Sequence, residues 1–251
     1  MTSVGTVSLG PRARNRAARR EQFLDAALDI AATDGLDALT MSRLAAATGL
    51  SIGAVYRYFD SKGALLAQVQ RCAIGSLEES YLTVAERIDA GLASVFDTPV
   101  AALGAVVFFG RFFCAAAVTH PHELRLLQLL MMNGQQSMSL EDALTVLPQA
   151  VSMLERAQER IAYAVELGAL TPGDTFDRTV RWAASLGGVL QVSTLGRLDA
   201  TRFDGLRLAR EHNAELMVGW GASRSVVAAL DEWMTAYATE AELAPKVATD
   251  V

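Results

Sequence analysis

The sequence has little that would mark a secreted or membrane-spanning protein. Only two cysteines occur in 251 residues, Cys72 and Cys114, and they lie far apart and form no disulfide framework, so we expect a reducing cytoplasm. The N-terminus has arginines but no apolar run behind them, so we expect no signal peptide. The longest apolar run, 100–109, is too short to span a membrane and is soon interrupted by Arg111.

Signatures of catalysis and metal binding are missing as well. The sequence has no P-loop, no GxGxxG after a strand and no GxSxG motif. Its three histidines have no convincing set of further ligands at metal-binding spacing. We therefore expect no enzyme activity, no cofactor and no metal. Strand-like alternation of polar and apolar residues is nearly absent, which predicts an all-α fold.

The most informative segment is residues 40–62, TMSRLAAATGLSIGAVYRYFDSK. The pattern predicts two short helices joined by a tight turn and followed by a third helix. Thr40 and Ser51 are expected N-caps, whose hydroxyls accept a hydrogen bond from a free backbone N–H at a helix start. Gly49 can take the positive φ that a tight bend requires. Such a hairpin is typical of DNA-binding proteins, although generic helical proteins also contain similar hairpins.

The second helix of this hairpin, expected over 52–59, presents a small and cationic face. At 100° per residue, Val55 and Phe59 fall on the buried stripe. Small side chains allow a helix to approach base edges, and arginine and tyrosine reach phosphates or bases. Tyrosines in a helix are equally often half-buried packing residues. The outward side carries Gly53, Ala54 and Arg57, with Tyr56 and Tyr58 at its two edges.

Together these residues resemble the DNA-binding domain of the TetR family of bacterial transcriptional regulators. The family signature is a tyrosine, two variable positions and a phenylalanine, then a short turn, a lysine and two leucines. The resemblance covers about residues 18–66 and implies an N-terminal three-helix helix-turn-helix domain that binds DNA. The signature stands here as Tyr56, Phe59, Lys62, Leu65 and Leu66, and an upstream amphipathic helix with Phe23, Ala27, Ile30 and Ala31 ends at Gly35.

The resemblance and the outward face together assign a set of residues to DNA. Thr40, Tyr58 and Lys62 would hold phosphates. The residues that would face the bases are Ser51, Gly53, Ala54 and Tyr56. Ala54 and Gly63 depart from the family pattern, because a threonine and a glutamate are common there. Ile52 is buried by helical angle but its position can face DNA in the family, so its side stays open. The expected DNA-binding residues are Thr40, Ser42, Arg43, Ser51, Gly53, Ala54, Tyr56, Arg57, Tyr58 and Lys62.

The two ends of the chain differ in charge. Residues 1–20 contain five arginines and no acidic residue, and residues 1–62 carry a net charge of +2. The remainder carries −8, so only the N-terminal end suits DNA electrostatically. Glycines and a proline at the start indicate an arm that reaches a minor groove or the DNA backbone, or an ordinary solvated tail. We therefore expect a flexible arginine-rich arm over 1–17, a helix-turn-helix domain over 18–66 and a helical effector-binding and dimerisation domain over 67–251.

Beyond residue 66 the chain reads as helix throughout, with helices expected at about 61–90, 98–118, 121–133, 144–169, 174–196, 202–218 and 223–240. Phenylalanines around Arg111 indicate an aromatic-walled pocket in which the arginine anchors an anionic ligand. Aromatic residues in a helical core are more often plain core, and the inducer pocket that the resemblance implies favours a site here. The expected ligand-binding residues are Phe108, Arg111, Phe112, Met131, Tyr163 and Trp182.

A second surface is expected to pair two copies of the chain. Small residues in the helix around 178–195 allow close approach of another helix, and the resemblance implies a four-helix dimer interface. Packing within one subunit is the alternative. A dimer suits DNA recognition, since one recognition helix reads too few base pairs for specificity. The expected interface residues are Trp182, Ser185, Leu186, Val189, Leu206, Asn213 and Met217.

These features predict a ligand-responsive transcriptional regulator that binds double-stranded operator DNA as a homodimer in the cytoplasm. We expect a repressor that a small, largely hydrophobic effector releases from its operator. The alternative is an α-helical enzyme or a lipid-binding protein whose N-terminal hairpin is merely structural. Substitutions in the hairpin separate the two hypotheses, because only a regulator would lose DNA binding.

Overall fold

The computed structural model describes residues 10–133 and 139–246, and within these ranges it contains helices and no strand. The all-α prediction is therefore confirmed. The α-helices are α1 (Pro11–Asp34), α2 (Met41–Thr48), α3 (Ile52–Tyr56), α4 (Lys62–Val95), α5 (Thr98–Thr119), α6 (Pro121–Asn133), α7 (Leu140–Glu166), α8 (Thr175–Gln191), α9 (Gly205–Gly219), α10 (Arg224–Tyr237) and α11 (Glu240–Leu243), with 3-10 turns at Leu36–Ala38 and Val192–Leu195.

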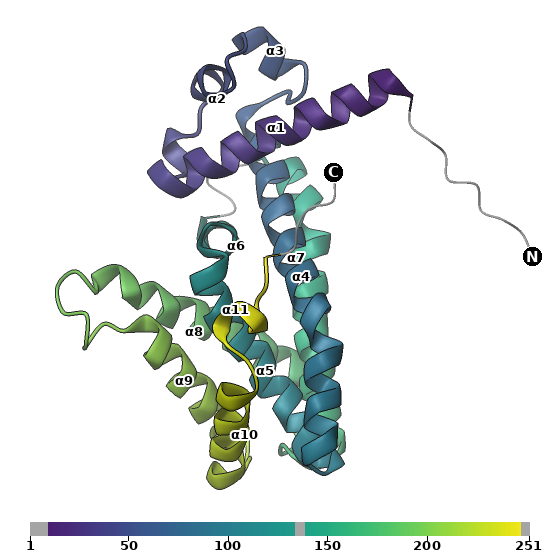
Figure 1. Ribbon diagram of the computed structural model, residues 1–251, viewed down its shortest axis with the longest axis vertical. Helices are drawn as coiled ribbons and strands as arrows, with labels where there is room; N and C mark the ends of the chain where they lie inside the picture. The colour runs from purple at the N-terminus through teal and green to yellow at the C-terminus, as the bar shows by residue number, and fades with distance from the viewer. Residues whose placement is uncertain (1–9, 134–138, 247–251) are drawn as a thin grey trace, which may run out of the picture.

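The helices form two apolar cores that meet at α6. Helices α1, α2 and α3 sit at one end of the molecule, across the start of α4 (Figure 1). Their shared core contains Phe23, Leu44 and Val55, each fully buried, and α6 adds Leu126 to it. The second and larger core fills the body between α4 and the helices that follow. The N-terminal helices thus rest on the body through both α4 and α6.

Helix α5 lies at the centre of the body. It is long and apolar enough to cross a membrane by length and composition, but 78% of its most apolar window is buried inside the molecule. Helices α4, α7, α9, α10 and α11 all pack against it. A helix that is apolar on every side is expected in such a position, because neighbouring helices cover its whole circumference.

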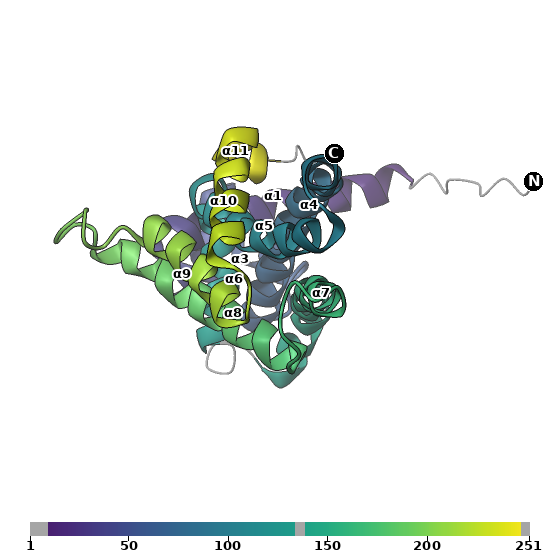
Figure 2. The same cartoon turned by 90° about the horizontal axis from the view of Figure 1, so that it is seen from below.

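The later helices wrap α5 from the other side. Helices α8 and α9 form an antiparallel pair whose connection reaches away from α4 and α7 (Figures 1 and 2). Helix α10 then leads to the short α11, which packs on α5 and α4. The C-terminal segment is held to α4 by two hydrogen bonds. The Ser80 hydroxyl donates to the Pro245 carbonyl at 2.7 Å, and the Arg87 guanidinium donates to the Glu242 carbonyl at 3.0 Å.

The N-terminal arm differs from its expected form. Residues 11–17 belong to α1, which begins at Pro11, instead of forming a flexible segment. Proline suits the first position of a helix, since it has no N–H to leave unpaired, and arginine and alanine are good helix formers. The rest of the expected arm, residues 1–9, lies outside the described part of the chain.

Gly63 lets the body contact the first turn of α4. A Cβ atom at this position would lie 2.5 Å from the Oδ2 atom of Asp142, in the first turn of α7. A larger side chain would require the Asp142 side chain to move aside, and the glutamate that is common in the family would also bring a second carboxylate next to it. The start of α7 thus lies directly beside Lys62, one of the expected phosphate contacts.

Candidate nucleic-acid interface and effector site

Three side-chain caps fix the helix-turn-helix geometry. The hydroxyl oxygens of Thr40, Ser51 and Ser61 accept hydrogen bonds from backbone N–H groups at the starts of α2, α3 and α4, at 3.2, 3.2 and 2.9 Å. Gly49 ends α2 with φ at 67°, in the left-handed region. The predicted caps at Thr40 and Ser51 and the predicted turn at Gly49 are confirmed.

The outward face of α3 differs from its prediction at Ala54. This residue is only 7% exposed and packs inside the hairpin, whereas Ile52 is 46% exposed and Tyr56 50%. The prediction placed a helix over 52–59, but α3 ends at Tyr56. A helical wheel that uses Phe59 to locate the buried side therefore assigns the wrong orientation to the residues of α3. Ser51 and Gly53 are exposed as expected. The surface open to bases therefore gains Ile52 and loses Ala54.

The residues expected to contact phosphate surround this face. Tyr58 is half-buried, with its ring 5.3 Å from that of Phe23, and Lys62 is half-buried at the first position of α4. Lys62 and Arg57 have no ion pair within the described ranges. Both cations therefore remain available for phosphate oxygens.

The start of α2 has its own polar contacts. The side chains of Thr40 and Ser42 share a hydrogen bond at 3.1 Å, and both residues are exposed. Arg43 forms an ion pair with Asp34 at the end of α1. That pair reduces the net positive charge that Arg43 offers to DNA.

An apolar cavity of about 100 Å³ lies in the body between α5, α6, α7 and α8. Trp182 is the one member of the expected ligand set with a described side chain that lines it. The side chain of Met131 lies outside the described part of the structure. The polar side chain in the wall is Gln128, whose Nε2 donates to the Gly187 carbonyl at 3.4 Å. The lining residues are Phe109, Phe113, Leu124, Leu127, Gln128, Ala150, Met153, Leu154, Trp182, Ala183, Leu186, Gly187 and Leu190.

Two phenylalanines expected in the pocket belong to the core instead. Phe108 and Phe112 are fully buried, and their ring centroids lie 5.7 and 5.3 Å from that of Tyr81. Their neighbours Phe109 and Phe113 face the cavity. The sequence could not separate these pairs, because α5 is apolar on all sides. A helical wheel therefore does not show which side of α5 faces the cavity.

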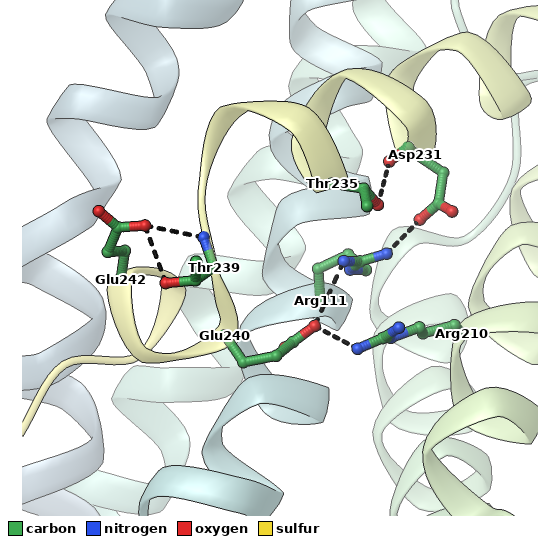
Figure 3. Close-up of polar contacts among 7 residues, drawn as sticks. All are labelled: Arg111, Arg210, Asp231, Thr235, Thr239, Glu240 and Glu242. Carbon is green, nitrogen blue, oxygen red and sulfur yellow. Dashed lines mark hydrogen bonds and ion pairs between the residues drawn. The ribbon is translucent and has the colours of Figure 1, made fainter.

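Arg111 does not line the apolar cavity, and its charge is paired within the chain, which differs from the prediction of a ligand anchor. Its guanidinium is buried and pairs with the carboxylates of Asp231 at 2.7 Å and Glu240 at 3.5 Å (Figure 3). Arg210 of α9 also pairs with Glu240. This cluster joins α5 and α9 to α10 and α11, so Arg111 holds the C-terminal helices in place. Nearby, burial raises the pKa of the Cys114 thiol to about 12, against the opposing effect of Arg111, so this thiol stays protonated.

Tyr163 lies in a different hollow, a groove of about 590 Å³ between α4, α5 and α7. Arg160 of α7 spans this groove and forms two hydrogen bonds with Asp89 of α4, both at 2.9 Å. Beneath it, burial raises the pKa of Tyr81 to about 12, although Arg160 acts in the opposite direction. Tyr163 and Trp182 therefore cannot contact one small ligand together.

Most of the expected dimer residues are covered within one subunit. Trp182, Leu186, Asn213 and Met217 are all buried. The Trp182 indole N–H donates to Asn213 Oδ1 at 2.9 Å, and Asn213 Nδ2 donates to the Val107 carbonyl at 3.2 Å. These four residues join α8 and α9 to α5. They therefore follow the alternative to a dimer interface, which was packing within one subunit. Among the other expected residues, Ser185, Val189 and Leu206 are half-buried.

The outer side of α8 carries a stripe that was not predicted as an interface. Phe176, Val180, Ala184 and Gly188 recur every four residues and are all exposed. Residues at that spacing share one face of a helix. The spacing was legible in the sequence, but the buried and exposed sides of α8 could not be told apart without its neighbours. Within the described ranges, no group of three or more His, Cys, Asp or Glu residues is placed to hold a metal ion.

Comparisons with known proteins agree with the N-terminal hairpin and the overall fold. The family model for bacterial regulatory proteins of the tetR family matches residues 23–69. No curated protein sequence matches the chain. The transcriptional regulator PfmR from Thermus thermophilus, of the TetR family, is 21% identical with a TM-score of 0.52, and the match covers 78% of this chain and 96% of that one.

Two regulators named FadR share the fold as well. The fatty acid degradation regulator FadR from Bacillus halodurans is 19% identical with a TM-score of 0.55, over 86% of this chain and all of the other. The transcriptional regulator FadR from Bacillus subtilis, solved in complex with stearoyl-CoA, is 16% identical with a TM-score of 0.52, over 79% and 98%. At such identities the match concerns the fold.

Proposed function

We propose, from the premise that this chain is a bacterial regulatory protein of the TetR family, that it is a dimeric repressor which a small apolar effector releases from operator DNA. The observation that carries this proposal is the double contact of α6. Leu126 is buried in the core of the DNA-binding helices, while Leu124, Leu127 and Gln128 line the apolar cavity. A ligand that fills the cavity would therefore displace α6 and, through Leu126, the helices that hold α3.

The displacement acts on DNA binding only if the ligand prefers one arrangement. A ligand shifts an equilibrium by its difference in affinity for the two states. The effector would bind more tightly when α6 has moved outward, because the cavity of about 100 Å³ then enlarges. Two recognition helices must match successive major grooves about 34 Å apart, so a small movement of each domain weakens the dimer on its operator.

The cavity walls indicate a neutral, apolar effector. The part of the lining that the structure describes carries no charged side chain, and an unpaired charge in such surroundings would be strongly disfavoured. An engineered apolar cavity of about 150 Å³ binds benzene, so this cavity suits a small ring or a short alkyl group. Stearoyl-CoA, which is bound in the Bacillus subtilis FadR structure, combines a long alkyl chain with a charged CoA group, and only the alkyl part resembles the effector proposed here. A long acyl chain would need a larger cavity here.

Filling the cavity tests this function. Ala183→Leu adds apolar atoms to its wall and is expected to leave DNA binding intact while preventing release by neutral apolar compounds. The measurement is fluorescence anisotropy of a duplex selected by the wild-type chain, titrated with indole and other neutral ring compounds and with their carboxylate analogues. The matched control is Ala90→Leu, on the exposed side of α4. Release by the carboxylates alone would contradict the proposed effector class.

The exposed stripe on α8 is the proposed dimer surface. Phe176 and Val180 are 59% and 40% exposed, and Ala184 and Gly188 allow a second helix to approach closely. Two copies of this face around a two-fold axis would bury the apolar side chains that one chain leaves open. The half-buried Ser185, Val189 and Leu206 lie on the same two helices and remain candidates for its margin.

A charge in this stripe is expected to separate the dimer. Val180→Glu would place a carboxylate next to its own copy across the axis, with a cost of several kcal/mol. Size-exclusion chromatography with light scattering should then give the mass of one chain, against two for the wild type. Ala90→Glu carries the same charge change on α4 and should stay dimeric. A dimeric Val180→Glu variant would rule out this face.

The alternative of an enzyme or lipid-binding protein with a merely structural hairpin is not favoured, since the hairpin matches a DNA-binding family. A repressor that acts on operator DNA would work in the cytoplasm, in keeping with free thiols at Cys72 and Cys114.

A further inference from the structure

The first three turns of α1 lie outside the segment that matches the family model. That match begins at Phe23, whereas α1 begins at Pro11. The described arginines of this extension, at positions 14, 16, 19 and 20, are all exposed. None forms an ion pair within the described ranges, and Arg19 and Arg20 donate only to the neutral amides of Gln22 and Gln68. The extension is therefore a helix of uncompensated positive charge.

One face of this extension turns toward the recognition helix. Arg16 and Arg19 precede Phe23 by seven and four residues, so all three share a side of α1. Phe23 is fully buried in the core of the DNA-binding helices. The same side, continued toward the N-terminus, therefore runs beside the residues that follow α3. The guanidinium of Arg16 lies 5.8 Å from the ring centroid of Tyr58.

These residues line a hollow of about 590 Å³ at the edge of the DNA-binding face. Its walls are Asn15, Arg16 and Arg19 from α1, and Arg57 and Tyr58 from the chain after α3. Among the described side chains, three guanidinium groups meet there and no carboxylate lines the hollow. Each has several N–H donors in a planar fork, a geometry that suits phosphate oxygens.

We propose that this hollow is a second phosphate-binding site, which takes the DNA backbone beside the major groove that α3 enters. The inference rests on the proposed DNA-binding function. Because the arginines stand on a formed helix, they bind along the outside of the backbone and do not thread a minor groove as a flexible arm would. A preformed helix also avoids most of the ordering entropy that a disordered arm loses on binding.

The site is also tied to the helix that leads into the body. Arg20 Nη2 donates to Gln68 Oε1 of α4 at 2.9 Å. Any change in the angle between α1 and α4 would therefore move Arg16 and Arg19 relative to Arg57. The phosphate contacts of the extension would be lost together with those of α3 when the effector binds.

The test is the salt dependence of binding by the full chain. The probes are a random-sequence duplex of about 30 base pairs and a duplex selected by the wild-type chain. Each phosphate contact contributes about 0.9 to the slope of log K against log salt. The double variant Arg16→Gln/Arg19→Gln should lower the slope by about 2. It should also weaken binding to both duplexes by a similar factor, about tenfold or more, because phosphate contacts carry no sequence information.

Two further variants make the outcome decisive. Arg197→Gln/Arg202→Gln removes the same charge from the exposed connection between α8 and α9, and should keep the wild-type slope. Arg16→Lys/Arg19→Lys keeps the charge and should retain most of the wild-type slope. If Arg16→Gln/Arg19→Gln binds with the wild-type slope and affinity, this second site is wrong while the proposed function stands. If the wild-type chain binds no duplex, the proposed function fails and the inference fails with it.

Discussion

Gly53→Glu is expected to abolish binding of the chain to duplex DNA while leaving its fold unchanged. Gly53 is exposed in the first turn of α3, and a Cβ atom there would meet nothing within 4 Å. The helix therefore accommodates a side chain, but the new carboxylate would lie between α3 and the phosphates. Juxtaposed like charges cost several kcal/mol, so the affinity should fall by about a hundredfold or more. Fluorescence anisotropy with a duplex selected by the wild-type chain measures it.

Two controls give this result its meaning. Ala90→Glu makes the same charge change on the body and should bind the duplex normally, which separates a local clash from a change in net charge. Circular dichroism and thermal unfolding should match the wild type for both variants. Affinity within about threefold of the wild type for Gly53→Glu, a difference of under 1 kcal/mol, would mean that α3 does not enter the groove.

Trp182→Ala is expected to lower the free energy of unfolding by about 3–5 kcal/mol, the range for removal of a large buried aromatic side chain. The loss should be at the upper end, because the substitution also leaves Asn213 Oδ1 without its donor. For a chain of this size the melting temperature should fall by roughly 10 °C. Thermal unfolding followed by circular dichroism measures the change.

The same experiment distinguishes a core position from an interface position. If Trp182 lies in the core of one chain, the fall in melting temperature should be the same at high and low protein concentration. A residue of the dimer interface would show a difference that grows on dilution. Trp182→Phe keeps a ring but loses the N–H donor, so it should be less harmful than Trp182→Ala. A change of less than about 1 kcal/mol in Trp182→Ala would contradict the buried bridge to α5.

The DNA-binding hairpin was predictable because its signals are local. Thr40, Gly49 and Ser51 determine helix starts and a turn within a few residues, and each acts on its own backbone neighbours. Helix bounds in the body were also legible, since prolines and glycines mark the joints between long apolar segments. The alanine at position 54 was misplaced because α3 is a short helix, and its orientation depends on how it packs against α2.

The body was less predictable because its contacts join distant parts of the chain. Arg111 looked like a ligand anchor among aromatic residues, but its partners Asp231 and Glu240 follow more than a hundred residues later. No local sequence pattern predicts an ion pair between residues so far apart. Likewise, Trp182 is an apolar residue on a helix with one buried and one exposed side. Composition alone could not show whether it lies in the core of one chain or in an interface between two chains. Only the positions of α5 and α9 decide which side of α8 is covered.

Because helix α4 is long, a small tilt at one end produces a large displacement at the other end. It runs for 34 residues without a proline, from Lys62 beside the DNA-binding face to Val95 at the far end of the body. At 1.5 Å per residue its length is about 50 Å, so a tilt of about 5° at one end moves the other by about 4 Å. In the proposed dimer this displacement would occur in both subunits. A ligand that changes local packing by less than the width of a methyl group can thereby place two recognition helices out of step with the DNA repeat.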